Sequence, residues 1–443
     1  MNKTKLPLLR HNGINYLIPF IIITSCFALW GFANDITNPM VKAFSKIFRM
    51  NVTQGALVQV AFYGGYFAMA FPAAIFIKKF SYKSGILMGL ALYAIGALLF
   101  FPAKMMGSYW PFLFAYFVLT CGLSFLETSA NPYILTMGPE ENATRRLNLA
   151  QSFNPLGSLM GMFVAMQFIQ ARLNPMSSTE RATLSDEEFS LLSQSDLSIL
   201  IAPYLMIGLV VLIIFLIIFF TRMPVNGDKV KTFHFGSTLK RIFSVPNYRE
   251  GVIAQFFYVG AQIMCWTFII QYGTRIFMAQ GMEEQAAEVL SQKYNIVAMS
   301  LFIVSRFMAT FLMKFFNPGK MLRTFAVTAT ILSLGVIFFQ DIWGLYCLVA
   351  ISGCMSLMFP TIYGIALKGM GEDSKFGAAG LIMAILGGSL MPPIQARIID
   401  MGTLGASFPA VNASFILPLI SFLVVAWYGM KAYRRSIAFT PHI

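Results

Sequence analysis

The composition of this chain excludes most classes of soluble protein. It has 443 residues, of which 57% are apolar and only 11% are charged, whereas an average soluble domain carries about 25% charged residues. The formal net charge of +14 does not indicate nucleic-acid binding, because the basic residues lie in short clusters between apolar stretches, as the positive-inside rule and contact with anionic lipid predict. The sequence therefore indicates a polytopic membrane protein rather than a water-soluble enzyme.

Twelve apolar stretches are long enough to cross a bilayer as helices, since about 20 apolar residues span its hydrocarbon core. Uninterrupted runs such as 205–221 differ from the alternating strands of a membrane barrel, which are about 10 residues long. No small-residue cleavage site follows the first stretch, so we expect it to be retained and not removed as a signal peptide. In chain order the predicted spans are 15–39, 55–78, 84–103, 109–137, 147–170, 198–221, 250–275, 289–316, 320–340, 342–369, 377–399 and 406–432.

The basic residues predict the orientation of these spans. Most of them fall on one side, which is therefore assigned to the cytoplasm, and the even number of spans places both termini there. The opposite side holds the loop 171–197, which is richer in acidic than in basic residues. The predicted location is the bacterial cytoplasmic (inner) membrane. The basic side carries Lys3, Lys5, Arg10, Lys78, Lys79, Lys83, Arg145, Arg146, Arg222, Lys229, Lys231, Lys240, Arg241, Arg249, Lys314, Lys320, Arg323, Lys368, Lys375, Lys431, Arg434 and Arg435.

A cytoplasmic linker at 222–249 divides the chain into an N-terminal six-helix half, 1–221, and a C-terminal six-helix half, 250–443. Two short segments recur in both halves in the same order, about 232 residues apart, as internal repeats do. The first pair is Met-Gly-Pro-Glu-Glu from Met137 and Met-Gly-Glu-Asp from Met370; the second is Gly-Ser-Leu-Met from Gly157 and from Gly388. The predicted fold is therefore an all-α membrane protein of twelve transmembrane helices in two pseudo-symmetric halves. This is the major facilitator architecture, with its site near the midplane between the halves.

Glu127 is a carboxyl near the middle of the fourth predicted span. Ser124, Glu127, Thr128 and Asn131 share one helical face by their spacing, and such a stripe implies water or a hydrophilic ligand beside it. Because a buried carboxyl favours its protonated form and a wet one its ionised form, Glu127 could carry protons and also accept hydrogen bonds from substrate. The alternative is a carboxyl held in a structural ion pair or hydrogen bond.

Asp35 lies about one turn from the outer end of the first span, in the segment from Trp30 to Pro39. A carboxylate inside a span is expensive and marks a functional candidate. The alternative is solvation or capping at the helix end, since Pro39 can terminate or kink the span.

Amide and aromatic side chains gather in the fifth and seventh spans. Amides suit hydroxyl groups because each offers donors and an acceptor, and the indole of Trp266 could cover the apolar face of a sugar ring. The alternative is hydrogen bonding between helices, to which we assign Asn148. The candidates are Gln151 and Asn154 in the fifth span, and Gln255, Tyr258, Gln262 and Trp266 in the seventh.

Arg306 lies about ten residues, or about 15 Å, inside the eighth span. An unpaired guanidinium is costly there, so we expect a carboxylate partner or a ligand in a cavity. Snorkelling of the long side chain towards the interface is the alternative.

The sequence offers no sign of a cofactor, and we expect none. The five cysteines, Cys26, Cys121, Cys265, Cys347 and Cys354, lie inside apolar spans without a CxxC spacing, so neither disulfides nor a metal site is expected. The three histidines lie outside the spans, and no GxxxxGK[ST] phosphate loop occurs.

Five segments together resemble the L-fucose:proton symporter family of the major facilitator superfamily, and the resemblance covers nearly the whole chain. It implies proton-coupled sugar uptake with two membrane carboxyls, one of which, in the motif Leu-Glu-Thr-x-Ala-Asn-Pro, corresponds to Glu127. The family also contains glucose/galactose transporters. The segments are Ala-Phe-Tyr-Gly-Gly-Tyr-Phe at 61–67, Leu-Glu-Thr-Ser-Ala-Asn-Pro at 126–132, Arg-Leu-Asn-Leu-Ala-Gln-Ser-Phe-Asn at 146–154, Ala-Gln-Phe-Phe-Tyr-Val-Gly-Ala-Gln at 254–262 and Phe-Pro-Thr-Ile at 359–362.

Two positions depart from the family pattern. Aligned from Trp30 without a gap, the family's aspartate falls on Asn38, which cannot titrate. Either the acid has moved to Asp35, almost one helical turn earlier, or proton coupling rests on Glu127 alone. Phe359 stands where the fucose transporters carry Tyr, which could change the sugar hydroxyls that are read.

The leading hypothesis is a proton-coupled sugar importer, most of all for L-fucose, that works by rocking alternating access. A glucose/galactose or other hexose porter is the alternative within the family, and a membrane-embedded transferase is the alternative outside it. The chain is thus predicted to be a transporter and not an enzyme, with a sugar, protons and lipid as partners, and a monomer by resemblance. The predicted substrate-binding residues are Trp30, Asn38, Glu127, Asn131, Gln151, Asn154, Gln255, Tyr258, Gln262, Trp266 and Arg306, and the predicted proton-coupling residues are Glu127 and Asp35.

Overall fold

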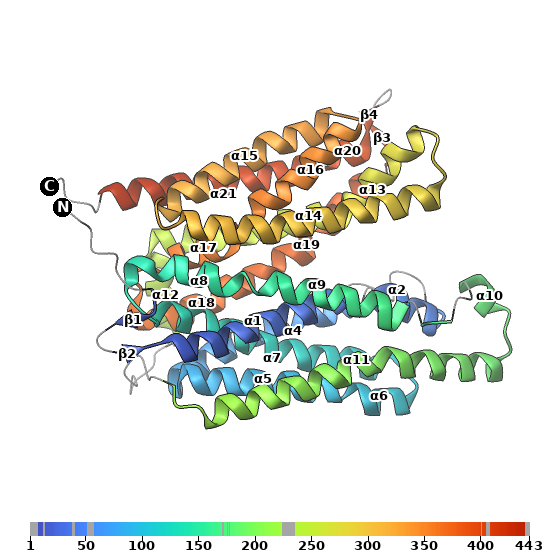
Figure 1. The fold of residues 1–443 in the computed structure, drawn as a ribbon, viewed down its shortest axis with the longest axis horizontal. Helices are drawn as coiled ribbons and strands as arrows, with labels where there is room; N and C mark the ends of the chain where they lie inside the picture. Colours follow the sequence, from blue (N-terminus) through green and yellow to red (C-terminus); the bar gives the residue numbers. More distant parts are fainter. Residues whose placement is uncertain are drawn as a thin grey trace. The chain divides into compact units, whose positions relative to one another are not determined.

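The computed structural model describes residues 8–11, 14–37, 40–50, 57–170, 172–174, 176, 178–223, 235–399, 401–404 and 408–438. Within these ranges the chain is almost entirely helical (Figure 1). The strands found there form two short antiparallel pairs. β1 (Arg10–His11) pairs with β2 (Ile14–Asn15), and β3 (Thr403–Leu404) pairs with β4 (Phe408–Pro409).

Eleven helical segments of the described chain are long and apolar enough to cross a membrane, which confirms the predicted all-α membrane class. Several are divided into consecutive helices by a short irregular step. The helices that form them are α1 (Leu17–Thr37), α4 (Leu57–Lys79), α5 (Tyr82–Leu98) with α6 (Phe100–Met106), α7 (Tyr109–Thr136), α11 (Asp186–Phe220), α13 (Pro246–Ala279), α14 (Glu284–Leu312), α15 (Pro318–Phe338), α16 (Ile342–Met355) with α17 (Met358–Ala366), α18 (Ser374–Met383) with η4 (Ala384–Leu386) and α19 (Gly387–Ile399), and α20 (Ala410–Ser414) with α21 (Ile416–Ala438).

The predicted span 147–170 is not among these eleven segments. It consists of α8 (Ala143–Gln151), α9 (Asn154–Val164) and the π-helical turn η2 (Ala165–Gln170). Pro155 has no backbone N–H, so the helical ladder cannot continue through the carbonyl four residues before it. The fifth predicted span is therefore present in pieces.

Large apolar side chains remain exposed on the faces of these helices. Met105, Trp110 and Phe220 are 75%, 70% and 78% exposed. A water-soluble protein rarely exposes a contiguous apolar surface of this kind, whereas lipid covers it without cost. These faces therefore fit contact with the bilayer.

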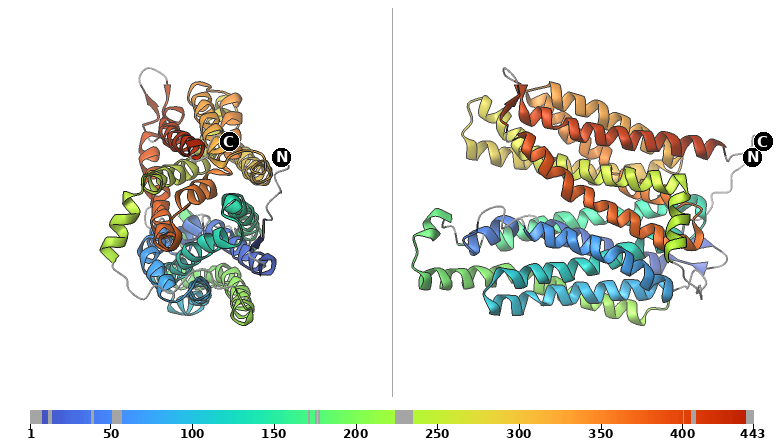
Figure 2. Two further views of the ribbon diagram at one scale, coloured as in Figure 1. Left: turned by 90° about the vertical axis from the view of Figure 1, so that its left-hand side faces the viewer. Right: turned by 180° about the vertical axis from the view of Figure 1, so that it is seen from behind.

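The chain divides into two compact units, each of which contains a bundle of long helices (Figures 1 and 2). The first unit consists of Met1–Leu8, Gly138–Ser152 and His234–Ile443; the second consists of Leu9–Met137 and Phe153–Phe233. The fifth span is thus shared, because α8 belongs to the first unit and α9 to the second. The domain boundaries at 222–249 stay a prediction.

The repeated glycine segments occupy equivalent positions in the two units. α9 packs on α1, and a Cβ at Gly157 would collide with the backbone of Ala28. In the other unit α19 packs on α13: a Cβ at Gly388 would come against the side chains of Ile263 and Val259, and one at the adjacent Gly387 would collide with the backbone of Phe256. Small residues let helix backbones approach closely in membranes, so the fifth span meets the first as the eleventh meets the seventh.

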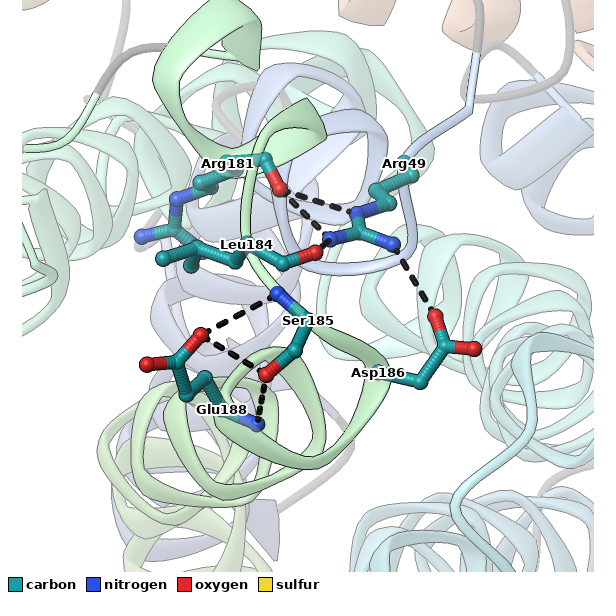
Figure 3. A network of polar contacts seen from close by, with 6 residues as sticks. All are labelled: Arg49, Arg181, Leu184, Ser185, Asp186 and Glu188. Atoms are coloured by element: carbon teal, nitrogen blue, oxygen red, sulfur yellow. Dashed lines mark hydrogen bonds and ion pairs between the residues drawn. The ribbon is translucent and has the colours of Figure 1, made fainter.

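α11 begins well before the predicted span 198–221. Ser185 and Glu188 form a capping box at its first turn: the Ser185 side chain accepts from the Glu188 backbone N–H, and the Glu188 carboxylate accepts from the Ser185 backbone N–H at 3.1 Å (Figure 3). A capping box satisfies two backbone donors at a helix start, so the helix extends beyond its apolar part.

A buried ion pair fixes the loop between the fifth and sixth spans. Arg181 and Asp196 are buried and approach to 2.6 Å. Arg49, which follows α2 (Met40–Ile47), donates to the carbonyl of Arg181 at 2.6 and 3.0 Å and to that of Leu184 at 2.8 Å (Figure 3). The loop is therefore tied both to α11 and to the chain after α2.

The described part of the linker forms α12 (Phe235–Ser244), which a bidentate ion pair anchors. Arg241 donates to the two carboxylate oxygens of Asp373 at 2.6 and 2.7 Å. These hydrogen bonds and the negative charge of Asp373 raise the pKa of the Arg241 guanidinium above its ordinary value. Both residues belong to the first compact unit, so α12 is attached to the last six spans.

Candidate functional site

α7 carries a buried polar stripe. Ser124, Thr128 and Asn131 are fully buried, and Glu127 is 2% exposed. The hydroxyl of Ser124 donates to the carbonyl of Tyr66 on α4 at 3.1 Å. The stripe therefore lies inside the second compact unit and not against lipid, as its helical spacing predicted.

Glu127 has aromatic polar groups beside it. Trp30 of α1 and Tyr66 of α4 both interact with its carboxyl group, while its Oε2 makes no hydrogen bond to a described residue. None of the ion pairs formed by the described residues includes Glu127. Within the described chain a structural ion pair therefore does not account for this carboxyl.

Asp35 is half-buried near the end of α1 and interacts with Tyr63 of α4. Tyr63 in turn interacts with Tyr66, the neighbour of Glu127. Neither tyrosine is among the site residues predicted from the sequence, although their i, i+3 spacing in the segment 61–67 places both hydroxyls on one helical face. Asn38 lies outside the described residues.

α1 also meets the start of α9. The side-chain amide of Asn154 donates to the carbonyl of Phe27 at 3.2 Å, and the indole of Trp30 stacks on the Phe27 ring with centroids 4.9 Å apart. One helix thus contacts Glu127 through Trp30 and Asn154 through Phe27. Of the predicted site residues, the second compact unit holds Trp30, Asp35, Glu127, Asn131 and Asn154.

The predicted site residues of α13 belong to the first compact unit and differ in the hydrogen bonds that their polar side-chain atoms make. Gln255 is fully buried, and neither atom of its amide hydrogen-bonds to a described residue. Tyr258 donates to the carbonyl of Met355 at 3.0 Å, and Trp266 donates to Ser352 at 3.2 Å, while Gln262 is half-buried. Gln255 is therefore the α13 residue whose polar atoms call for a ligand or water.

Arg306 binds carbonyl oxygens, and of the two expected partners, a carboxylate or a ligand, the described residues do not supply the carboxylate. Its guanidinium donates to the carbonyl of Ser356 at 2.5 Å and to that of Gln151 at 2.9 Å, and it lies 4.5 Å from the centroid of the Phe302 ring. It is 4% exposed, and the ion pairs of the described residues do not include it. The side chain therefore does not snorkel, and the first compact unit joins two predicted site residues, Gln151 and Arg306.

The described residues contain no group of three or more His, Cys, Asp or Glu side chains that could hold a metal ion. All five cysteines are unpaired, and Cys26, Cys121 and Cys265 are buried. They act as small apolar side chains in the helix packing.

Residues 23–392 match the family model described as the Major Facilitator Superfamily. An L-fucose-proton symporter of Haemophilus influenzae is 52% identical over 95% of this chain and 97% of that protein. An L-fucose-proton symporter of Escherichia coli is 34% identical over 93% of this chain and 92% of that protein. A glucose/galactose transporter of Brucella abortus is 30% identical over 94% of each.

Solved structures agree with these matches. A crystal structure of the transporter FucP in the outward conformation gives a TM-score of 0.84 at 33% identity and covers 94% of this chain and 99% of that one. A bacterial homologue of the iron transporter ferroportin, with a TM-score of 0.64 at 11% identity over 94% of this chain and 99% of that one, is similar in fold alone.

Proposed function

Because the chain belongs to the Major Facilitator Superfamily, we propose that it is an L-fucose–proton symporter that works by alternating access. The observation that carries this proposal is Glu127, a buried carboxyl without an ionic partner among the described residues. The 52% identity to an L-fucose-proton symporter over nearly the full length supports the choice of sugar.

Glu127 is the proton-coupling carboxyl. An ionised carboxylate is costly in hydrocarbon, so a carboxyl closed off from water changes its protonation when the site opens. Trp30 and Tyr66, which border Glu127, shield it from bulk water, and proton binding is thereby linked to the change of conformation.

Asp35 is the second proton-coupling acid and takes the role that Asn38 cannot perform. It lies in a more exposed environment than Glu127, so a proton from the outside would reach it first. Tyr63 interacts with Asp35 and with Tyr66, and Tyr66 interacts with Glu127, so two hydroxyl groups, which can both donate and accept, connect the surroundings of the two acids.

Amide and aromatic side chains of each compact unit are the candidates for sugar binding. The candidates in one unit are Trp30, Asn131 and Asn154. In the other unit Gln255 offers a buried amide whose two polar atoms make no hydrogen bond to a described residue. The other residues assigned to substrate binding are Asn38, Glu127, Gln151, Tyr258, Gln262, Trp266 and Arg306.

A specific residue favours the second candidate, a glucose/galactose porter. The Phe359 ring, with its centroid 6.3 Å from that of Tyr258, cannot donate a hydrogen bond, whereas the fucose transporters that this chain resembles carry Tyr at this position. The glucose/galactose transporter of Brucella abortus is the relative that represents this alternative.

Uptake by proteoliposomes tests both candidates. L-fucose, D-glucose and D-galactose, each radiolabelled, are offered with and without an imposed pH gradient, acid outside. We expect accumulation of L-fucose that requires the gradient, and little of the other two sugars. Accumulation of glucose and galactose in its place would establish the second candidate, and uptake of no sugar would refute both.

The chain is a multi-pass membrane protein, and we assign it to the bacterial inner membrane, as the bacterial relatives suggest. Both termini face the cytoplasm, in accord with the positive-inside rule. We also propose that it acts as a monomer, with each six-helix half rocking against the other.

A further inference from the structure

Arg306 donates to two backbone carbonyls that have lost their helical donors. In an α-helix the carbonyl of residue i accepts from the N–H of residue i+4. Four residues after Gln151 stands Pro155, and four residues after Ser356 stands Pro360, neither of which has an N–H. The Arg306 guanidinium supplies a donor to each of these carbonyls. A single buried arginine therefore donates to the carbonyls at both helix breaks.

These hydrogen bonds satisfy both the buried guanidinium and the backbone carbonyls. Arg306 is 4% exposed, and a guanidinium buried at this depth needs acceptors. A carbonyl without a donor is also costly inside a membrane, and a charged donor makes one of the stronger hydrogen bonds to it. Because Gln151 closes α8 and Ser356 follows α16, the side chain joins two helix ends to its own helix, α14.

Two further contacts attach the rest of α8 to α17. The side-chain amide of Asn148 donates to the hydroxyl of Thr361 on α17 at 3.2 Å, and Gly364 lies against the side chain of Thr144. Positions 144, 148 and 151 share one helical face, so this face of α8 is bound from one end to the other within the first compact unit. α9, the continuation of the same span, belongs to the other unit.

We propose that Arg306 is a positioning residue that latches α8 to α14 and α17, and that this latch must open in each transport cycle. The proposal rests on alternating access by the proposed transporter, in which the two six-helix halves move against each other. α8 is part of the first half in sequence but is held by the second half, so it cannot follow its own half until Arg306 releases the carbonyl of Gln151. Pro155 and Pro360 strengthen the latch, because neither has an N–H that would compete with the arginine for those carbonyls.

Accessibility of a reporter cysteine at position 144 tests the latch. Thr144→Cys is introduced after the five native cysteines have been replaced by Ser or Ala, and its reaction rate with a maleimide is measured on the purified full-length protein without sugar. Thr144 is 8% exposed, so the reaction reports separation of α8 from α17. Arg306→Lys keeps the charge but cannot reach both carbonyls with one ammonium, and we expect labelling about tenfold faster, as for the loss of one hydrogen bond to a charged group.

Two proline variants test the same latch without a change to the arginine. Pro155→Ala and Pro360→Ala each return an N–H that competes for the carbonyl, so each should accelerate labelling, by about threefold since competition is partial. The matched control is Pro203→Ala, the same substitution inside α11 of the other unit, which should leave the rate unchanged. An arginine with a merely structural role would change the melting temperature without changing the labelling rate of the folded protein.

Wild-type labelling rates in Arg306→Lys would overturn the proposal. Should Arg306→Lys fail to fold, wild-type rates in both Pro155→Ala and Pro360→Ala would overturn it equally. The measurement needs no sugar, so failure of L-fucose uptake would refute the proposed function and leave the result for the latch standing.

Discussion

Glu127 illustrates how one buried atom can be assigned a function. Its Oε2 lacks a hydrogen-bond partner among the described residues, so Glu127→Gln removes the titratable group without breaking an ion pair of the described chain. One pH unit is worth about 1.4 kcal/mol, or about tenfold accumulation by a one-to-one symporter. We expect the variant to lose this accumulation in proteoliposomes and to retain exchange of labelled for unlabelled sugar. Unchanged gradient-driven accumulation would remove Glu127 from the coupling mechanism.

The second acid can be located by comparing two substitutions. If Asp35 has replaced the titratable group expected at Asn38, Asp35→Asn should reduce the pH dependence of uptake several-fold more than Asn38→Ala. Asp35 interacts electrostatically with Tyr63, so Tyr63→Phe should shift the same pH profile to a smaller extent. A larger effect from Asn38→Ala would return the role to the position at which the family carries its aspartate.

At the scale of helices, sequence patterns predicted well which residues lie on buried or closely packed helix faces. They predicted poorly where the helices begin or break. The polar stripe around Glu127 and the repeated glycines were readable, because burial and close approach follow from residue type and spacing. Ser185 and Glu188 also carried a readable signal, since Ser-x-x-Glu is a capping box, yet the apolar pattern alone placed the start of α11 too late.

The partner of Arg306 could not be predicted in the same way. The expectation of a carboxylate or a ligand followed from its charge, but the acceptors in the structure are backbone carbonyls of residues 155 positions earlier and 50 positions later. Pro155 and Pro360 were visible in the sequence. Which donor would reach the carbonyls that they leave unsatisfied depends on tertiary packing, and a single sequence does not specify that packing.

The close approach of α9 to α1 gives a stability prediction at the helix scale. Gly157→Ala would place a methyl group into the backbone of Ala28, and such overpacking typically costs about 1–3 kcal/mol. Gly64→Ala is the matched control, because a Cβ at Gly64 meets nothing within 4 Å. Thermal unfolding followed with a thiol-reactive dye, which reports exposure of the buried native cysteines, should show a lower melting temperature for Gly157→Ala only. Equal melting temperatures would mean that the two helices separate without cost.

For the whole molecule, the predicted topology states which loops lie on each side of the membrane, and the direction of transport depends on it. Glu187, in the first turn of α11, and Ser244, at the end of α12, are both exposed and lie on opposite sides in the predicted topology. Single cysteines at these positions, in a background without the native cysteines, should react with a membrane-impermeant maleimide in complementary preparations: Glu187→Cys in right-side-out vesicles and Ser244→Cys in inside-out vesicles. The preference should be about tenfold or more, since the bilayer excludes the charged reagent. Labelling of both cysteines from the same side would require an even number of spans between them and would contradict a single crossing by α11. Reversed labelling of both would place the basic loops outside and contradict import driven by an inward proton gradient.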